Sequence, residues 1–332
     1  MKPATLRLGS RRSPMAIAQS GEVARLITER TGRPVEIVGV TTFGDVTREQ
    51  LTQIGGTGVF VSALRESLLR GQVDFAVHSL KDLPTGQAPG ITLAAVPHRD
   101  DPRDALVGHD GAKLADLPSG ARIGTGSPRR AAQLELLRGD ITCVPIRGNV
   151  DTRLTKVRDG EFDAVVLAYA GLTRIGCTDL VTEIFEPDDM VPAPGQGALA
   201  IECRADDAEL AKLLAAVDDS VSRAAVIAER ALLAALEAGC TAPVGAYATG
   251  AERLHLHGVA LGRPAAGSDD GTGGIGGTGA GTGTGGTIVV RERGEAKAAD
   301  AERLGRDLAA RMLARGVANL MGARTDRNDA HD

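Results

Sequence analysis

Arginines lie in loops that follow expected strands or at expected helix starts, and together they predict a site for an anionic ligand. A cation in the first helical turn faces the positive end of the helix dipole, so Arg129 and Arg130 are unfavourably placed unless an anion lies nearby. Helix N-termini bind carboxylates and phosphates, and arginine does so with paired hydrogen bonds. For any single arginine, solvated surface charge is the alternative. The full set is Arg11, Arg12, Arg129, Arg130, Arg147, Arg153 and Arg174.

Asp82 and Cys240 are further candidates for chemistry, although their patterns alone favour simpler roles. Asp82 closes HSLKDLP after an apolar strand. A carboxylate beside cations stays ionised and can stabilise a developing positive charge or relay a proton, but the pattern alone favours a turn aspartate before Pro84. Cys240 follows an expected helix in EAGCTAPVGAY. A lone cysteine is more often a small buried residue, and a helix C-terminus raises the pKa of a thiol.

Alternating short strands and amphipathic helices fill the first two-thirds of the chain. The stretches LRLGSRRSP from Leu6 and ARIGTGSPRR from Ala121 both predict a strand, a small-residue turn and a helix that starts at Ser-Pro. Two similar α/β halves of this kind would enclose a cleft, and ligands bind outside the carboxyl ends of strands in open α/β sheets. Strands are expected at 6–8, 35–40, 73–77, 143–146 and 164–168, and helices at 14–31, 59–69, 128–138 and 150–160.

The last third of the chain has a different pattern. Helices are expected at 206–217, 221–238 and 298–320, with two strands of a small sheet at 254–260 and 287–291. Residues 267–286 are rich in glycine and threonine, so we expect a flexible insert at a hairpin tip. The segment after Gly322 is polar and is expected to fray.

Composition excludes several classes of protein. The 332 residues include 42% hydrophobic and 24% charged residues, as in soluble globular proteins, and no apolar run reaches the length of a membrane span. A net charge of −5 with 2% aromatic residues argues against a general nucleic-acid binder. Four scattered cysteines and no secretory signal predict free thiols in the cytoplasm. The histidine spacing indicates no metal site, and a monomer without an obligate protein partner is the default expectation.

Motifs along residues 5–250 resemble the hydroxymethylbilane synthase family, also called porphobilinogen deaminase. They occur in family order, and several are long and unusual in composition. They are GSRRSPMAIAQ from Gly9, FGDV from Phe43, GGTGVFVSALRESLL from Gly55, DFAVHSLKDLP from Asp74, RDDPRDAL from Arg99, IGTGSPRRAAQL from Ile123, IRGNVDTRL from Ile146, FDAVVLAYAGLTRIG from Phe162, PAPGQGALAIECR from Pro192, AERALLAALEAGC from Ala228 and PVGAYA from Pro243.

The resemblance implies an α/β fold with two lobes like those of periplasmic binding proteins and a small α/β C-terminal domain. The implied lobes are 1–98 with 196–217, and 99–195, and the implied C-terminal domain is 218–322, before a polar tail at 323–332. The implied reaction joins four porphobilinogen molecules head to tail, with loss of ammonia, to give hydroxymethylbilane in tetrapyrrole synthesis. The family builds this chain on a dipyrromethane cofactor, which the motif attaches to Cys240 through a thioether.

The same resemblance assigns roles to individual residues. Asp82 would be catalytic: it would hydrogen-bond the pyrrole N–H, stabilise the azafulvenium ion formed as ammonia leaves, and help to remove the proton after carbon–carbon bond formation. Each pyrrole carries an acetate and a propionate, which explains a site rich in arginine. Cofactor contacts are implied for Lys81, Arg129, Arg130, Ser127, Thr125 and Ser79, and substrate contacts for Arg11, Ser13, Arg147, Asn149, Arg153, Arg174 and Gln196.

The chain departs from the family pattern in two places. Gln53 and Thr57 stand where many relatives have lysine, so a glycine-rich lid at 51–60 would contribute less charge, and we carry no substrate contact onto these residues. Phe60 could pack near the cofactor. The insert 267–286 is also outside the pattern and has no assigned role. The alternative is a non-catalytic, two-lobed receptor for a small anion, which would need neither Asp82 nor Cys240. A relative that has lost its catalytic activity is a further alternative, and it would not need to retain both residues.

Overall fold

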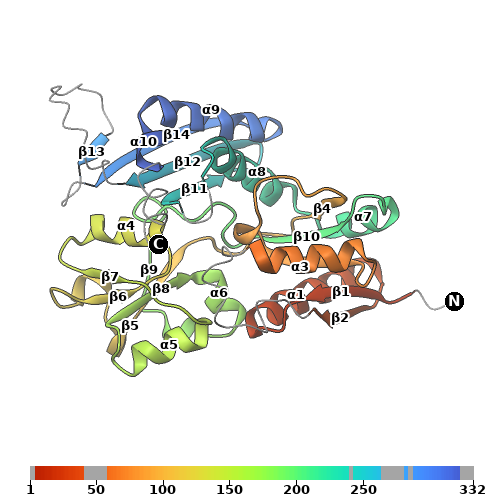
Figure 1. Cartoon of the computed structure of the whole chain (residues 1–332), viewed down its shortest axis with the longest axis horizontal. Helices are drawn as coiled ribbons and strands as arrows, with labels where there is room; N and C mark the ends of the chain where they lie inside the picture. The colour runs from red at the N-terminus through yellow and green to blue at the C-terminus, as the bar shows by residue number, and fades with distance from the viewer. Residues whose placement is uncertain (1–3, 41–57, 239–241, 263–279, 283–286, 322–332) are drawn as a thin grey trace, which may run out of the picture. The chain divides into compact units, whose positions relative to one another are not determined.

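A computed structural model describes residues 4–40, 58–238, 242–262, 280–282 and 287–321 (Figure 1). The chain forms two compact units. Unit 1 contains Met1–Pro102, Tyr169–Thr178 and Gly195–Ala224, and unit 2 contains Arg103–Ala168, Asp179–Pro194 and Ala225–Asp332. The three-domain boundaries expected from the motifs stay a prediction. Gln53, Thr57 and Cys240 lie outside the described residues, as does the side chain of Phe60.

Unit 1 is built on a five-stranded sheet in the order β2-β1-β3-β10-β4. Strands β1, β2 and β3 run parallel, whereas β10 is antiparallel to both β3 and β4. Strand β10 comes from Gly195–Ala224, the segment that returns to this unit late in the chain. The strands are β1 (Leu6–Ser10), β2 (Val35–Gly39), β3 (Phe75–Ser79), β4 (Ile91–Ala95) and β10 (Leu199–Arg204), and the helices are α1 (Pro14–Thr31), α3 (Gly58–Leu69), α6 (Tyr169–Arg174) and α7 (Ala208–Leu214).

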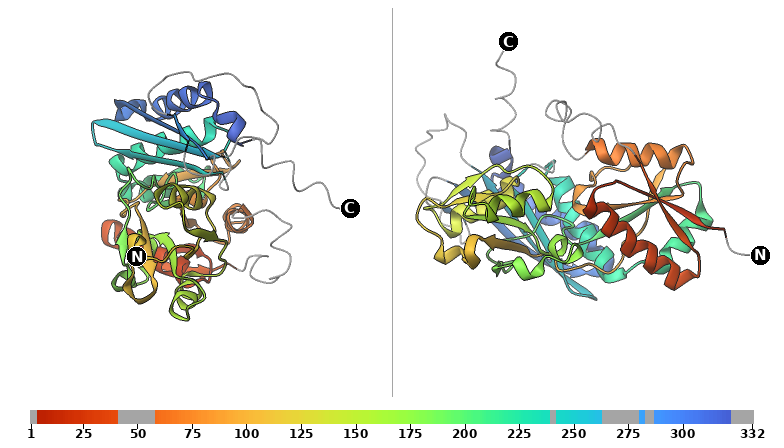
Figure 2. Two further views of the ribbon diagram at one scale, coloured as in Figure 1. Left: turned by 90° about the vertical axis from the view of Figure 1, so that its left-hand side faces the viewer. Right: turned by 90° about the horizontal axis from the view of Figure 1, so that it is seen from below.

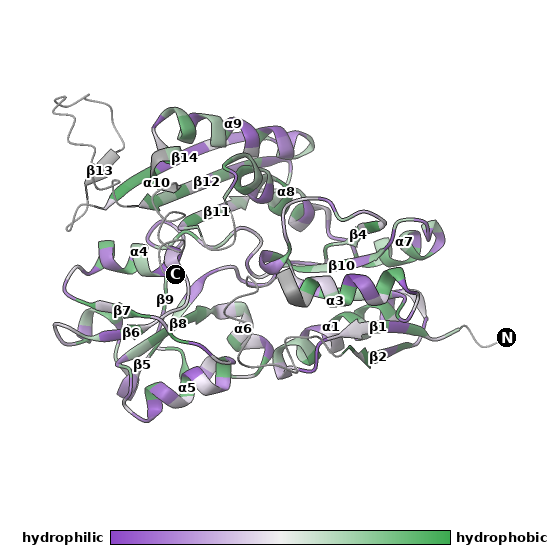
Figure 3. Ribbon diagram, in the orientation of Figure 1, coloured by the Kyte–Doolittle hydropathy of each residue, from purple (hydrophilic) through white to green (hydrophobic). Residues whose placement is uncertain are grey.

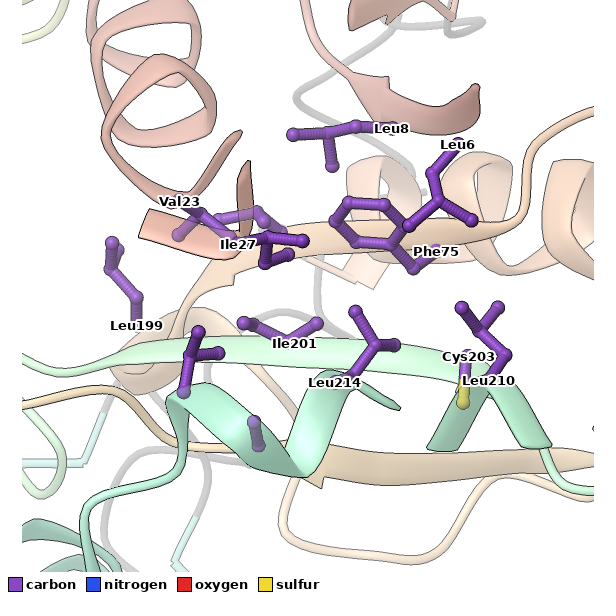
Figure 4. Packing of buried hydrophobic residues seen from close by; sticks show 13 residues of the cluster. Leu6, Leu8, Val23, Ile27, Phe75, Leu199, Ile201, Cys203, Leu210 and Leu214 are labelled. Atoms are coloured by element: carbon purple, nitrogen blue, oxygen red, sulfur yellow. The ribbon is translucent and has the colours of Figure 1, made fainter. Parts of the chain in front are cut away.

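Helix α1 begins and ends where the sequence predicts. The Ser13 hydroxyl accepts a hydrogen bond from the Ala16 N–H, and Gly32 ends the helix with φ of 68°. Val23 and Ile27 of α1 pack with Leu8, Phe75 and other residues on one face of the sheet (Figure 4). Leu64 and Leu68 of α3 pack in a second cluster, and Figure 2 shows the two helices on opposite faces of the sheet.

Unit 2 contains a second five-stranded sheet with the same pattern of strand directions. Its order is β7-β6-β8-β5-β9. Strands β6, β7 and β8 are parallel, and β5 is antiparallel to both β8 and β9. The repeat of strand, Ser-Pro turn and helix therefore produces two sheets of one topology. The elements are β5 (Asp104–Gly108), β6 (Arg122–Gly124), α4 (Pro128–Leu137), β7 (Thr142–Val144), α5 (Val150–Arg158), β8 (Ala164–Ala168) and β9 (Glu183–Ile184).

A four-stranded antiparallel sheet, β11-β12-β14-β13, forms the rest of unit 2. Gly258 of β12 lies against Leu232 of α8 and Met312 of α9, so both helices cover one face of this sheet. Figure 3 shows α9 with hydrophobic and hydrophilic residues on different sides, as expected for such a helix. The elements are α8 (Ser220–Ala235), β11 (Val244–Thr249), β12 (Arg253–Gly262), β13 (Ala280–Thr282), β14 (Ile288–Lys297), α9 (Ala301–Ala314) and α10 (Val317–Met321).

Short 3₁₀ helices complete the described chain, at Leu80–Asp82, His109–Gly111, Leu114–Asp116, Thr178–Leu180, Ala215–Val217 and Ala298–Asp300. Among the described residues, no helix combines the length and the apolar character that crossing a membrane requires.

The C-terminal third differs from the prediction in several details, and strand β11 was not predicted. The expected single helix at 298–320 is two helices, because Gly316 has φ of 85° and breaks the helical hydrogen-bond pattern between α9 and α10. The expected flexible insert at 267–286 contains β13, whose backbone pairs with β14. Backbone pairing needs no bulky side chains, so glycine-rich sequence can still extend a sheet edge.

Candidate functional site

Asp82 lies at the end of a buried strand of unit 1. Strand β3 leads directly into the 3₁₀ turn Leu80–Asp82, and the Leu80 N–H donates to the Ala198 carbonyl at 3.0 Å. Ser79 and Asp82 are half-buried. No side chain or backbone group among the described residues forms a hydrogen bond or ion pair with the Asp82 carboxylate. The turn therefore holds a carboxylate that can receive a partner from a ligand.

Gln196 holds the neighbouring Lys81. The Gln196 Oε1 accepts from the Lys81 Nζ at 3.4 Å, and its Nε2 donates to the Pro102 carbonyl at 2.7 Å. The Gln196 carbonyl accepts from Arg99 Nε at 2.8 Å. Gln196 is buried between Gly195 and Gly197, which both have positive φ. Gln196 therefore helps to orient the ammonium group of Lys81, the residue before Asp82 in the chain.

Arg174 of unit 1 is surrounded by groups of the protein itself. Its guanidinium lies 2.8 Å from Asp100 and 3.3 Å from Glu22, donates to the Gly197 carbonyl at 2.9 Å, and is only 7% exposed. These contacts fix α6 and the Gly195–Gly197 turn. Of the other predicted residues in this unit, Ser13 caps α1 and Arg11 is half-buried.

Arg129 and Arg130 of unit 2 share one buried carboxylate. Arg129 Nη2 lies 2.8 Å from Asp104 Oδ2, and Arg130 Nη2 lies 2.7 Å from Asp104 Oδ1, with side chains 3%, 8% and 0% exposed, respectively. The helix-dipole argument for a ligand is therefore corrected, because Asp104 supplies the anion that offsets both cations. Burial lowers the pKa of Arg129, Asp104 raises it and Arg130 lowers it further, with a net decrease.

The remaining predicted residues of unit 2 lie at the starts of α4 and α5. Ser127 and Asn149 cap these helices, and the buried Thr125 accepts from the Ser127 N–H. Arg153 donates to the Gly148 carbonyl at 3.0 Å, and burial together with the charge of Arg130 lowers its pKa.

Arg147 is exposed and has no ion-pair partner within the described part of the chain. Unlike the Asp104-bound arginines, Arg147 offers an open guanidinium.

The described residues just before Cys240 form a hydrogen-bonded end of helix α8. At the end of α8, the Ala238 N–H donates to the Leu233 carbonyl and the Glu237 N–H donates to the Ala234 carbonyl, the pattern of a Schellman cap. Glu237 has φ of 52°, a left-handed conformation unusual for a residue with a side chain.

Two other cysteines carry thiols of raised pKa. Burial raises the pKa of Cys143 to about 12 and that of Cys203 to about 11, so these thiols are poor nucleophiles at neutral pH.

The sequence analysis did not predict two buried polar clusters that the structure contains. In unit 1, Glu202 accepts from Arg65 at 2.7 and 2.9 Å and lies 3.3 Å from His78 Nε2. In unit 2, Gln133 and Arg129 bind the backbone of Val191. The sequence did offer a signal for the first cluster, because Glu202 is a charged residue in the interior of the otherwise apolar strand β10.

Comparisons of the sequence with family models and with known proteins agree on one family. Residues 6–212 match the family model "Porphobilinogen deaminase, dipyromethane cofactor binding domain", and residues 223–268 match "Porphobilinogen deaminase, C-terminal domain". Porphobilinogen deaminase 1 of Streptomyces coelicolor is 56% identical over 98% of this chain and 99% of its own length. Porphobilinogen deaminase of Thermobifida fusca is 63% identical over 77% of this chain and 81% of its own.

Among solved structures, the Methionine Binding Protein MetQ is 13% identical with a TM-score of 0.41, over 64% of this chain and 88% of its own, a similarity too weak to bear on function. The sequence matches carry the assignment, and they include the dipyrromethane cofactor named by the family model. The chain belongs to the porphobilinogen deaminase family, transferases that condense porphobilinogen into hydroxymethylbilane in tetrapyrrole synthesis.

Proposed function

We propose that Asp82 is the catalytic group of this condensation and that Cys240 carries the dipyrromethane cofactor. The observation that carries the first part is the half-buried Asp82 carboxylate, which has no hydrogen-bond or ion-pair partner among the described residues. A rigid turn after a buried strand keeps the carboxylate in place. Lys81 and Ser79, next to it, would assist in binding the cofactor.

The donors of unit 2 fit a cofactor that bears several carboxylates. Two pyrrole rings carry two acetates and two propionates, and the starts of α4 and α5 supply cations and hydrogen-bond donors. Arg129 Nε is buried and has no acceptor among the described residues, so part of this guanidinium is left without a protein partner. We assign Arg129, Arg130, Thr125 and Ser127 to the cofactor. When bound, it supplies the pyrrole carbon to which the first substrate is joined.

Asp82 would act on each porphobilinogen in turn. Its carboxylate would accept a hydrogen bond from the pyrrole N–H and stabilise the positive charge that develops as the aminomethyl group loses ammonia. After the new carbon–carbon bond forms, the same carboxylate would take the proton released from the ring carbon.

The remaining predicted residues would hold the acetate and propionate groups of the substrate. These are Arg11, Ser13, Arg147, Asn149, Arg153, Arg174 and Gln196. The contacts favour direct binding by the exposed Arg147, whereas Arg174 and Gln196 would act mainly by fixing the turn beside Lys81. The free thiols of Cys143, Cys177 and Cys203 suit a reducing compartment, which supports our placement of the enzyme in the cytoplasm.

Substitution of Asp82 tests the catalytic assignment. Asp82→Asn keeps the size of the side chain but removes its charge and its ability to take a proton. We expect turnover to fall by about 10²- to 10⁴-fold, while the melting temperature and the cofactor mass stay at wild-type values. Asp110→Asn, at an exposed position, is the matched control. Near-normal turnover of Asp82→Asn would remove Asp82 from the mechanism.

A further inference from the structure

We propose that Gln133 is a positioning residue that fixes β11, the strand that follows Cys240 in the chain, relative to Arg129 and Arg130. Gln133 lies on α4, is fully buried, and uses both ends of its amide on one residue. Its Oε1 accepts from the Val191 N–H at 2.8 Å, and its Nε2 donates to the Val191 carbonyl at 3.1 Å. Arg129 Nη1 donates to the same carbonyl at 2.6 Å. Helix α4 therefore forms hydrogen bonds to both the N–H and the carbonyl of Val191.

The other side of this segment holds β11. The Pro192 carbonyl accepts from the Ala246 N–H at 3.0 Å. A Cβ atom on Gly245 would lie 2.7 Å from the Val191 carbonyl oxygen, so the two backbones approach closely only because residue 245 is glycine. The Val191 side chain packs in a cluster with Val259 and Val289 of the four-stranded sheet. Residues 191–192 thus join α4 to β11.

This junction connects the two parts of the cofactor site that unit 2 contributes. Helix α4 carries Arg129 and Arg130, and β11 begins at Val244, shortly after Cys240 in the chain. A carboxylate of a group attached at Cys240 can meet these arginines only if β11 has a fixed position relative to α4. The inference rests on the proposed attachment at Cys240 and adds to it the residue that sets the distance.

The chemistry of the Gln133 side chain matches this role. A side-chain amide carries its acceptor and its donor on two separate atoms, so it can bind the Val191 N–H and the Val191 carbonyl at once. A leucine of similar size would leave two buried backbone groups without these partners. We expect the β11 segment to shift, and a displacement of about 1 Å can slow a reaction about 10²-fold.

The test is the rate at which full-length apo-protein gains the cofactor during incubation with porphobilinogen, followed by intact mass. We expect Gln133→Leu to load about 10- to 100-fold more slowly than wild type. Gly245→Ala, which disturbs the junction from β11, should also load slowly, and it carries the test if Gln133→Leu does not fold. Ile123→Val removes one methylene from the core of the same unit and should load at the wild-type rate.

The outcomes separate this inference from the proposed function. Loading of Gln133→Leu or Gly245→Ala at the wild-type rate would overturn the positioning role and leave Cys240 as the attachment site. Equal slowing in Ile123→Val at a matched loss of melting temperature would also overturn it, because general instability would then explain the effect. A wild-type protein that never gains mass would reject the attachment itself, and the inference with it.

Discussion

The Asp104 carboxylate should control the stability of unit 2, because it compensates two buried guanidinium groups. Asp104→Asn preserves the shape of the side chain and removes its charge. Removing one partner of a buried ion pair leaves an uncompensated charge and costs about 3–5 kcal/mol. Because Arg129 and Arg130 are 3% and 8% exposed, water cannot replace the lost carboxylate.

Thermal unfolding followed by calorimetry measures this cost. At about 2–4 °C per kcal/mol for a domain of this size, the transition of unit 2 should fall by roughly 10 °C. Asp140→Asn is the matched control, since Asp140 also pairs with an arginine, Arg138, but at an exposed position where an ion pair contributes little. If the two variants melt alike, the reasoning about the buried cluster is wrong.

The same variant also tests whether Arg129 and Arg130 bind the cofactor. Carboxylates of a bound cofactor would supply negative charge to the cations that Asp104→Asn leaves uncompensated. Apo-protein carrying Asp104→Asn should therefore lose more stability than the loaded form. An equal loss in both forms would indicate that the two arginines serve only the buried cluster.

Three further substitutions test other parts of the structure. Burial raises the pKa of Glu202, but hydrogen bonds from His78 and Arg65 outweigh this effect and lower it to about 2. The resulting stabilisation, about 3 kcal/mol, is complete above the unfolded pKa near 4.5 and is lost as the pH falls towards 2. The free energy of urea unfolding should therefore fall more steeply over that window for wild type than for Glu202→Gln, and equal slopes would contradict this reasoning. Glu237→Gly should raise stability by about 0.5–1 kcal/mol, because glycine adopts a φ of 52° without steric cost, and a lower melting temperature would contradict this. Arg147→Ala should lower kcat/KM for porphobilinogen about tenfold or more with an unchanged melting temperature, and unchanged kinetics would exclude a substrate contact at this exposed residue.

Local sequence signals predicted the helix starts well. Ser13-Pro14 and Ser127-Pro128 begin α1 and α4 as expected, because a capping hydroxyl and a proline with fixed φ act within one helical turn. The end of β14 was harder to predict. The expected strand at 287–291 extends to Lys297, since its backbone pairs with β12 although many of its later side chains are charged.

Partners that are distant along the chain could not be predicted. The sequence identifies Arg129 and Arg130 as first-turn cations, but the anion that compensates them is Asp104 of β5, more than twenty residues earlier in the chain. Likewise, nothing local to Gln133 indicates that Val191 lies beside it. Periodicity and capping signals describe single elements, whereas these contacts exist only after the sheets have assembled.

The intact mass of the protein purified from a host that makes porphobilinogen tests the central claim most directly. We predict an excess over the polypeptide mass equal to two porphobilinogen molecules minus two ammonia molecules, and the loss of this excess in Cys240→Ala. A wild-type mass that stays equal to that of the bare polypeptide after incubation with porphobilinogen would contradict the account.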